Sequence, residues 1–283
     1  MVTKESIAVQ AHNAELSAAL AALKQERILA TQEGHLLLIG FNRVDKRNAA
    51  DLQLLQELSA AYGVLDEFDE LRVGVVYAEG DHFTGGLDLA DLAPRMGAGG
   101  LEIIPPGAVD PWRTGGRENR KPVVVAVQGI CLTLGIELIL ASEVAVAATD
   151  SSFAQIEVGR AILPFGGATI RFPSRCGWGN AMRWILSGDS FDASEALRIG
   201  LVQELVAPGT QKAAAIAIAK TIAQQAPLAV QATLKNARLA ESQGFAAASA
   251  ALQPELSRLF QSKDAAIGLR AFMSRTEPEF IGE

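Results

Sequence analysis

The chain has 283 residues, a formal net charge of −7 and a hydrophobic content of 49%. This length and a mean hydropathy of +0.20 predict a compact globular protein with a large core and argue against a disordered chain. The acidic balance, without a basic stripe, argues against nucleic acid as a partner.

Cysteine and histidine usage excludes several kinds of site. Cys131 and Cys176 lie far apart and outside any CxxC spacing, which excludes a disulfide scaffold or a cysteine zinc site and suits a reducing cytoplasm. His12, His35 and His82 form no HExxH or paired-ligand motif, and no GxSxG is present. We therefore expect neither a metal site nor a serine triad.

No targeting or membrane segment is expected. Residues 1–26 are alanine-rich but have no continuous apolar stretch and no small-residue cleavage pattern, so they predict a helical N-terminal extension rather than a secretory signal. The most apolar segment, 122–148, is interrupted by polar residues and falls short of the roughly 20 apolar residues that a membrane span needs. A cytoplasmic protein without a membrane span is predicted.

The first half of the chain alternates strand and helix patterns. Residues 35–41 predict a buried strand, and residues 73–78 predict a second strand that ends at a turn. Between them, apolar side chains recur at helical spacing: Leu52, Leu55, Leu58, Tyr62 and Leu65. Residues 95–120 hold six glycines and three prolines and predict a long surface loop or lid.

The second half is mostly helical. Strand character returns at 122–128 and near 143–147, and helical patterns then cover 180–186, 193–199, 211–224, 228–240 and a last set that reaches Phe272. Strands alternating with helices, followed by a helix-rich tail, predict an α/β class. The expected division is an extension at 1–26, an α/β core at 27–208 and a helical subdomain at 209–283.

Two segments share one design, a strand followed by a glycine-containing turn and a short helix. They are residues 73–88 and 123–137. Such a turn leaves backbone N–H groups free at the helix start, and two that converge on one oxygen would form an oxyanion hole. Gly85-Gly86 alone also fits a simple tight turn, and neither segment carries the GxGxxG dinucleotide fingerprint.

Two glutamates lie among apolar neighbours. Glu137 sits between Ile136 and Leu138, and Glu157 follows an apolar stretch. A buried carboxylate must be paired, protonated or functional, so an arginine partner for Glu137 stays open as an alternative. Two carboxylates in apolar settings are the pattern in which one acts as base and the other as acid near neutral pH.

The ordered blocks of the chain resemble those of the crotonase, or enoyl-CoA hydratase/isomerase, superfamily from about residue 27 to 282. The order and spacing of all the blocks make this resemblance more specific than any one of them. The blocks are Asn42-Arg-Val-Asp-Lys-Arg-Asn-Ala49, Phe83-Thr-Gly-Gly-Leu-Asp88, Lys121-Pro-Val, Gln128-Gly, Glu137-Leu, Phe153-Ala-Gln-Ile-Glu157, Pro164-Phe-Gly-Gly167, Ala193-Ser-Glu-Ala-Leu-Arg-Ile-Gly-Leu-Val202 and Ala271-Phe-Met-Ser-Arg-Thr276.

The resemblance implies a crotonase-like spiral of ββα repeats with a C-terminal helical trimerisation region. It also implies a coenzyme A thioester as substrate, no tightly bound cofactor besides the CoA carried by that substrate, and a homotrimer or a hexamer made of two trimers. Gly85 and Leu134 resemble the two oxyanion donors, and Glu137 and Glu157 resemble the catalytic glutamates. In hydration, Glu157 suits proton delivery at C2, while Glu137 holds and activates water.

The same resemblance assigns contacts with CoA. Phe272 and Arg275 resemble residues that reach the CoA bound by a neighbouring subunit, with arginine where lysine is common. Within one subunit the implied CoA-binding residues are Lys46, Arg47, Ala49, Gly86, Leu87 and Asp88.

The chain departs from the family pattern at several positions. Leu132-Thr-Leu-Gly135 replaces a glycine run and Phe165 replaces a common glycine, and both add bulk near the acyl group. Val44 replaces a frequent proline, which we regard as neutral. Residues 95–120, with Trp112 and Arg113, match no block and either set acyl specificity or form a mobile surface loop.

Several functions stay open. Hydration of a 2-enoyl-CoA, in fatty acid or related acyl-CoA metabolism, leads because both glutamates are present. Double-bond isomerisation needs Glu157 alone, and other crotonase-type reactions include hydrolysis and decarboxylation. A non-catalytic CoA-binding scaffold is favoured only by the bulk of Leu134 and Phe165.

Overall fold

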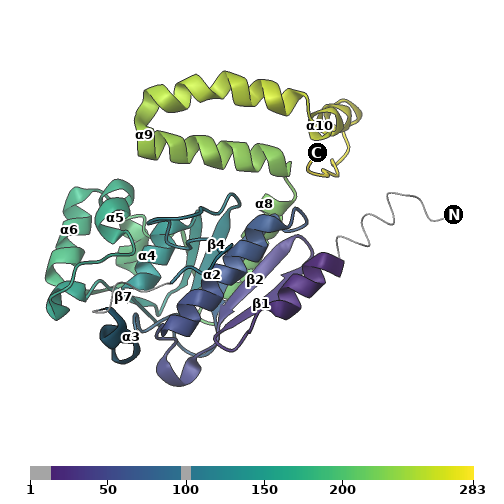
Figure 1. Cartoon of the computed structure of the whole chain (residues 1–283). Coiled ribbons are helices and arrows are strands. Elements are labelled where there is room, and N and C mark those ends of the chain that lie inside the picture. Colours follow the sequence, from purple (N-terminus) through teal and green to yellow (C-terminus); the bar gives the residue numbers. More distant parts are fainter. Residues whose placement is uncertain (1–13, 97–102) are drawn as a thin grey trace.

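Two sheets organise the protein in a computed structural model that describes residues 14–96 and 103–283 (Figure 1). The larger sheet has the strand order β1-β2-β3-β4-β6-β9, and the smaller has the order β5-β7-β8. The predicted α/β class is confirmed. The strands are β1 (Ile28–Glu33), β2 (Leu36–Phe41), β3 (Val73–Ala78), β4 (Val123–Val127), β5 (Ile130–Leu132), β6 (Val144–Ala148), β7 (Ser152–Ala154), β8 (Ser190–Asp192) and β9 (Glu204–Val206).

The centre of the larger sheet is covered on both faces. Strands β2, β3 and β4 are parallel and fully buried, as their near-continuous apolar sequences require. Side chains alternate between the faces, so Leu37 and Ile39 join one core and Leu36 and Leu38 join another. Helix α2 (Leu52–Glu67) contributes to the first core and helix α8 (Gln211–Ala223) to the second.

Three successive repeats place the functional segments next to one another. Each repeat runs from a strand of the larger sheet through a short extended segment to a helix: β3 to Thr84 and α3 (Leu89–Met96), β4 to β5 and α4 (Leu134–Ala141), β6 to β7 and α5 (Ala168–Cys176). The three short segments pair side by side, with Thr84 opposite Cys131 and Cys131 opposite Phe153. Residues that follow these positions therefore leave the small sheet at the same edge.

The C-terminal region is helical, as predicted. Helix α9 (Pro227–Phe260) bends back on itself at Gly244, which has a φ of 83°, and α10 (Lys263–Ser274) follows at the end of this hairpin (Figure 1). Shorter elements complete the chain: η1 (Val44–Lys46), η2 (Glu157–Arg160), α6 (Trp178–Ser187) and α7 (Ala193–Arg198). In the described ranges no single helix could cross a membrane; α8 and α9 satisfy the length and composition criteria only as a pair bent by 105°.

Several features differ from the sequence-based expectation, among them the short strands β5, β7, β8 and β9, which were not predicted. Strand β1 was not predicted; it pairs antiparallel with β2 along its whole length. Of the predicted N-terminal extension, residues 14–22 form a helix whose Leu16 is buried in the main core, and residues 1–13, with His12, lie outside the described residues.

Residues 103–120 are irregular, as predicted, and part of the segment is exposed, but residues 108–112 are buried rather than at the surface. Val109 is fully buried, Asp110 is 3% exposed and Trp112 is 6% exposed. The glycines and prolines here predict an irregular backbone but do not decide exposure, and the apolar side chains between them pack on the core. Residues 97–102 lie outside the described part of the chain.

Candidate active site

A cavity of about 90 Å³ lies at the edge where the three repeats meet. This is the space of about three water molecules at ~30 Å³ each. Both predicted glutamates line it, so the structure brings together Glu137 of the second repeat and Glu157 of the third. The remaining lining residues are Leu55, Leu87, Ile103, Ile104, Asp110, Trp112, Thr114, Leu134, Phe165 and Gly166.

The first two repeats touch at Gly86 and Thr133. Gly86 has a φ of 91°, and a Cβ at this position would lie 2.5 Å from the Thr133 hydroxyl oxygen, so only glycine fits. Thr133 has a φ of 49°, which is rare for a β-branched residue. This contact sets the next residues of the two repeats, Leu87 and Leu134, at the wall of the same cavity.

The N–H groups of Leu87 and Leu134 are the free donors here. Leu134 is the first residue of α4, where helix geometry leaves the N–H without an intrahelical acceptor. Leu87 lies opposite Ala50 in a short parallel bridge. The Ala50 N–H donates to the Gly86 carbonyl and the Asp88 N–H donates to the Ala50 carbonyl, so the bridge does not use the Leu87 N–H. Neither group donates to any acceptor within residues 14–96 and 103–283.

The expectation for Gly85 needs a correction. Its N–H donates to the Arg47 carbonyl at 2.8 Å and is therefore already used. The free donor of this turn lies two residues further on, at Leu87. The sequence assigns Leu87 to CoA binding, whereas the structure places it in the cavity wall beside Leu134.

Glu137 is 3% exposed and held by the loop that precedes α5. Its Oε1 accepts the Ala168 N–H at 3.1 Å, and its Oε2 lies 2.5 Å from where a Cβ on Gly166 would stand. Burial raises the pKa of Glu137 to about 7, against the opposing effect of the Ala168 N–H, and the charge of Glu157 adds to the rise. No arginine pairs with this carboxylate among the described residues.

Glu157 is the less restrained of the two carboxylates. It is 4% exposed, at the start of η2, three residues beyond the end of β7. Its Oε2 is buried without a hydrogen-bond partner in the described ranges, and burial raises the pKa of this carboxyl group. An unpaired buried carboxylate oxygen beside a cavity is well suited to exchange a proton with a bound molecule.

Of the CoA contacts predicted in the first two blocks, Leu87 lines the cavity, and Asp88 has a role within the protein itself. Lys46 and Arg47 are exposed at η1. Asp88 accepts from the Arg43 guanidinium at 2.7 Å, which lowers the pKa of its carboxyl group. Arg43 also donates to the Ala49 carbonyl at 2.9 Å. Asp88 therefore fastens the two loops together, and its contact with CoA stays a prediction.

Phe272 and Arg275 do not line this cavity. Phe272 is 83% exposed on α10, and Arg275 is the left-handed residue that ends this helix, with a φ of 54°. Figure 1 shows α10 at the far end of the α9 hairpin, away from α3 and α4. Within one chain these two residues are thus separated from the two glutamates.

The sequence left residues 95–120 open between a role in acyl specificity and a mobile surface loop, and it did not single out Asp110 or Thr114. Ile103, Ile104, Asp110, Trp112 and Thr114 all line the cavity. A tryptophan and an aspartate in a segment otherwise rich in glycine and proline were the available signal. Across the described residues, no group of three or more His, Cys, Asp or Glu side chains could hold a metal ion.

Comparison with known proteins gives one consistent family. The model of the enoyl-CoA hydratase/isomerase family matches residues 31–283. A probable enoyl-CoA hydratase from Rhizobium meliloti is 30% identical, over 91% of this chain and 99% of that protein. A crystal structure of a probable enoyl-CoA hydratase/isomerase from Mycobacterium abscessus has a TM-score of 0.89 and 52% identity, over 92% of this chain and 100% of that one. The enoyl-CoA hydratase of Mycobacterium tuberculosis H37Rv superposes with a TM-score of 0.82 at 33% identity, over 91% and 99% of the two chains. The predicted crotonase-like fold is confirmed.

Proposed function

Because this chain belongs to the enoyl-CoA hydratase/isomerase family, we propose that it adds water across the double bond of a 2-enoyl-CoA thioester. The observation that carries the proposal is the cavity itself. Two buried carboxylates from different repeats, Glu137 and Glu157, line it together with the residues whose N–H groups are free, Leu87 and Leu134. Acyl-CoA hydration needs this combination of an acid, a base and an oxyanion site.

The thioester carbonyl would accept the two N–H groups, so negative charge on its oxygen is stabilised as the enolate forms. The oxygen of water bonds to C3 while Glu137 takes a proton from that water, and the C2–C3 π electrons move into the enolate. Glu157 then gives a proton to C2, so that H and OH have been added in total, and Glu137 releases its proton to solvent while Glu157 takes one up, which restores the starting state. One proton-transfer residue contributes roughly 10²–10⁴-fold and one oxyanion donor roughly 10²–10³-fold.

Burial raises the pKa of both carboxyl groups, which suits proton exchange near neutral pH, while the assignment of acid and base rests on the chemistry of hydration. A carboxylic acid that donates to carbon near neutral pH must hold its proton longer than an exposed glutamate, and burial raises the pKa of Glu157 in that direction. Glu137, with a pKa of about 7, is ionised above neutrality and can then accept a proton from water. Hydration should therefore weaken as the pH falls below about 7.

The cavity also favours a short acyl group. Its volume is about 90 Å³, and its lining includes Leu134 and Phe165, two positions where this chain carries more bulk than the family pattern. Crotonyl-CoA, with four acyl carbons, is the substrate class that we propose. Longer enoyl thioesters would require these side chains or residues 103–114 to move.

Isomerisation of an enoyl-CoA double bond is the second candidate. The observation in its favour is the unpartnered Oε2 of Glu157, because one free carboxylate can move a proton from one carbon to another. Product analysis separates the two, since hydration gives a 3-hydroxyacyl-CoA and isomerisation gives only a shifted double bond.

Loss of the conjugated absorbance of crotonyl-CoA tests the proposal. Glu157→Gln should reduce hydration and any isomerisation by at least 10²-fold, because C2 loses its proton donor. Glu204→Gln, an exposed glutamate of β9, is the control and should leave the rate unchanged. A correctly folded Glu157→Gln variant with the wild-type rate would remove Glu157 from the mechanism.

We further propose that copies of the chain assemble through the C-terminal helices. Large apolar side chains stand exposed there in the single chain: Phe245 is 86% exposed, Phe260 75%, Phe272 83% and Met273 76%. Such a concentration of exposed apolar surface is typical of a protein–protein contact. A trimer, or a dimer of trimers, would bury it and could bring Phe272 and Arg275 of one copy to the CoA of the next.

A further inference from the structure

Residues 103–120 have no part in the hydration scheme, although they form one wall of its cavity. A single buried carboxylate organises their irregular backbone. Asp110 accepts the N–H groups of Trp112 at 2.9 Å, Thr114 at 2.6 Å and Gly115 at 2.9 Å, and also the Thr114 hydroxyl at 3.1 Å. The turn 110–115 is thereby fixed without any regular secondary structure.

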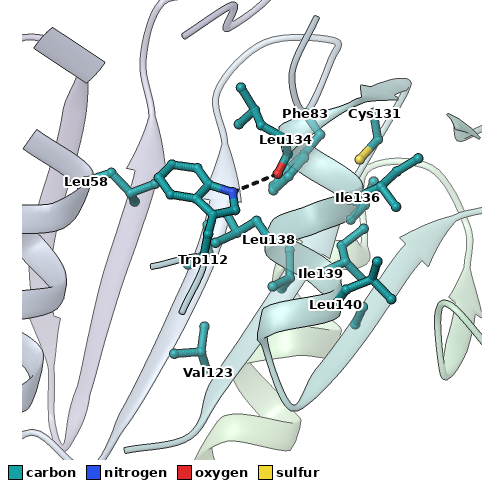
Figure 2. Close-up of a cluster of buried hydrophobic side chains, with 14 of the residues drawn as sticks. Leu58, Phe83, Trp112, Val123, Cys131, Leu134, Ile136, Leu138, Ile139 and Leu140 are labelled. Carbon is teal, nitrogen blue, oxygen red and sulfur yellow. Dashed lines mark hydrogen bonds between the residues drawn. The ribbon is translucent and has the colours of Figure 1, made fainter. Parts of the chain in front are cut away.

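This turn delivers the Trp112 indole to the start of α4. Its Nε1–H donates to the Leu134 carbonyl at 3.0 Å, and Figure 2 shows the indole nitrogen pointing at that oxygen. The ring is 6% exposed and belongs to the same buried cluster as Leu58 and Leu138. The hydrogen bond therefore lies in an apolar setting, where water does not compete for it.

The same ring supports the loop that holds Glu137. Its Cδ1 lies 3.2 Å from where a Cβ on Gly166 would stand, and the Gly166 N–H is one of the donors that lower the pKa of Glu137. Trp112 therefore contacts Leu134, whose N–H is a free donor, and lies against Gly166, whose N–H lowers the pKa of Glu137. In the described structure it is a physical link between the two halves of the site.

Leu134 needs such a restraint. It follows Thr133, whose φ of 49° and ψ of −112° are unfavourable for a threonine, and no side chain caps the helix at this point. The Thr133 backbone is held by the bonds from the Thr133 N–H to the Ala154 carbonyl and from the Glu137 N–H to the Thr133 carbonyl. The Leu134 N–H has no partner of its own in the described structure, so a small rotation of this turn would point it away from the cavity. A hydrogen bond to the carbonyl of the same residue opposes that motion.

We propose that Trp112 is a positioning residue, whose indole N–H holds the first turn of α4 so that the Leu134 N–H points at the thioester oxygen. This inference rests on the proposed hydration of an enoyl-CoA. A donor that is misdirected acts mainly on the charged transition state, so its loss should lower kcat far more than it changes KM.

The test begins with Trp112→Phe, which keeps an aromatic ring and removes the N–H. We expect kcat on crotonyl-CoA to fall about 10-fold, equivalent to about 1.4 kcal/mol, with KM changed less than about threefold. Trp184→Phe is the matched control, because Trp184 is 7% exposed and lies against Phe191 outside the cavity. It should leave kcat unchanged.

A second variant separates the N–H from the shape of the ring. Benzothienylalanine at position 112 has nearly the shape of tryptophan, with sulfur in place of the N–H, so folding should be preserved. It should lower kcat to the same extent as Trp112→Phe. Wild-type kcat in this variant would overturn the positioning role.

Binding of a conjugated dienoyl-CoA supplies a readout without turnover. Polarisation of its carbonyl by the oxyanion donors shifts the absorption to longer wavelength, and the shift should shrink in both Trp112 variants. A full shift in these variants would overturn the inference while leaving hydration standing. If wild-type protein neither hydrates crotonyl-CoA nor shifts the dienoyl spectrum, the proposed function fails, and this inference fails with it.

Discussion

Replacing Glu137 by glutamine should stabilise the fold while it damages hydration. Burial raises the pKa of Glu137 from 4.5 to about 7 in the folded chain. Below pH 4.5 the carboxyl is protonated in both the folded and the unfolded chain, and its ionisation contributes nothing to stability. Between pH 4.5 and 7 the unfolded chain releases the proton first, so the free energy of unfolding falls as the pH rises.

The size of this effect follows from the pKa difference. At about 1.4 kcal/mol per pKa unit, the full destabilisation above pH 7 is about 3 kcal/mol, of which about 1 kcal/mol has developed by pH 5. Glutamine cannot ionise, and its amide oxygen can still accept the Ala168 N–H. Relative to wild type, Glu137→Gln should therefore gain about 2 kcal/mol between pH 5 and pH 8, or several degrees in Tm.

Thermal and urea unfolding of both proteins at the two pH values measure this gain, with crotonyl-CoA hydration measured in parallel. Glu204→Gln, on an exposed residue of β9, controls for the general effect of removing a negative charge. A stability difference between Glu137→Gln and wild type that is the same at pH 5 and pH 8 would refute the raised pKa. Loss of stability at both would identify Glu137 as a structural residue.

Three further variants probe the proposed oxyanion site and the proposed subunit contact. Leu134→Pro deletes the N–H and should raise the activation barrier of hydration by about 3–4 kcal/mol. Leu134→Gly should keep activity and shift the preferred acyl length. Wild-type rates for the proline variant would exclude the Leu134 N–H as an oxyanion donor. Arg275→Ala should raise KM for acyl-CoA with kcat nearly intact, and the rise should be smaller for a substrate without the 3′-phosphate. An active monomer in sedimentation, or an unchanged KM, would contradict the proposed contact of Arg275 with the CoA of a neighbouring subunit.

The sequence predicts the centre of the fold better than its margins. Strand β3 has the predicted bounds, 73–78, because a continuous valine-rich run is buried on both faces whatever surrounds it. Strand β1 escapes prediction because half of its residues are exposed and polar, and only its pairing with β2 makes it a strand. Its conformation is decided by a neighbour rather than by its own pattern.

The same distinction applies to the site. That Glu137, Glu157 and Leu134 meet could be predicted from the resemblance, and all three line one cavity. Which N–H groups are free could not be predicted from the sequence. The Gly85 N–H donates to the Arg47 carbonyl, a partner 38 residues away in the chain. The part played by Trp112 depends likewise on a hydrogen bond between segments that no local pattern encodes.

Two departures from stable protein design lie beside the cavity. Thr133 has a left-handed φ and a buried hydroxyl without a partner in the described structure, and the Glu157 Oε2 is likewise unpaired. Each of these features lowers stability, by about 1–3 kcal/mol for backbone strain or for an unsatisfied buried group. The strain has a geometric origin, since the contact of Thr133 with Gly86 is what sets Leu87 and Leu134 at one wall. Leu87 and Leu134 carry the donors of the proposed oxyanion site, so a substitution at Thr133 that relieves this strain is expected to weaken that site.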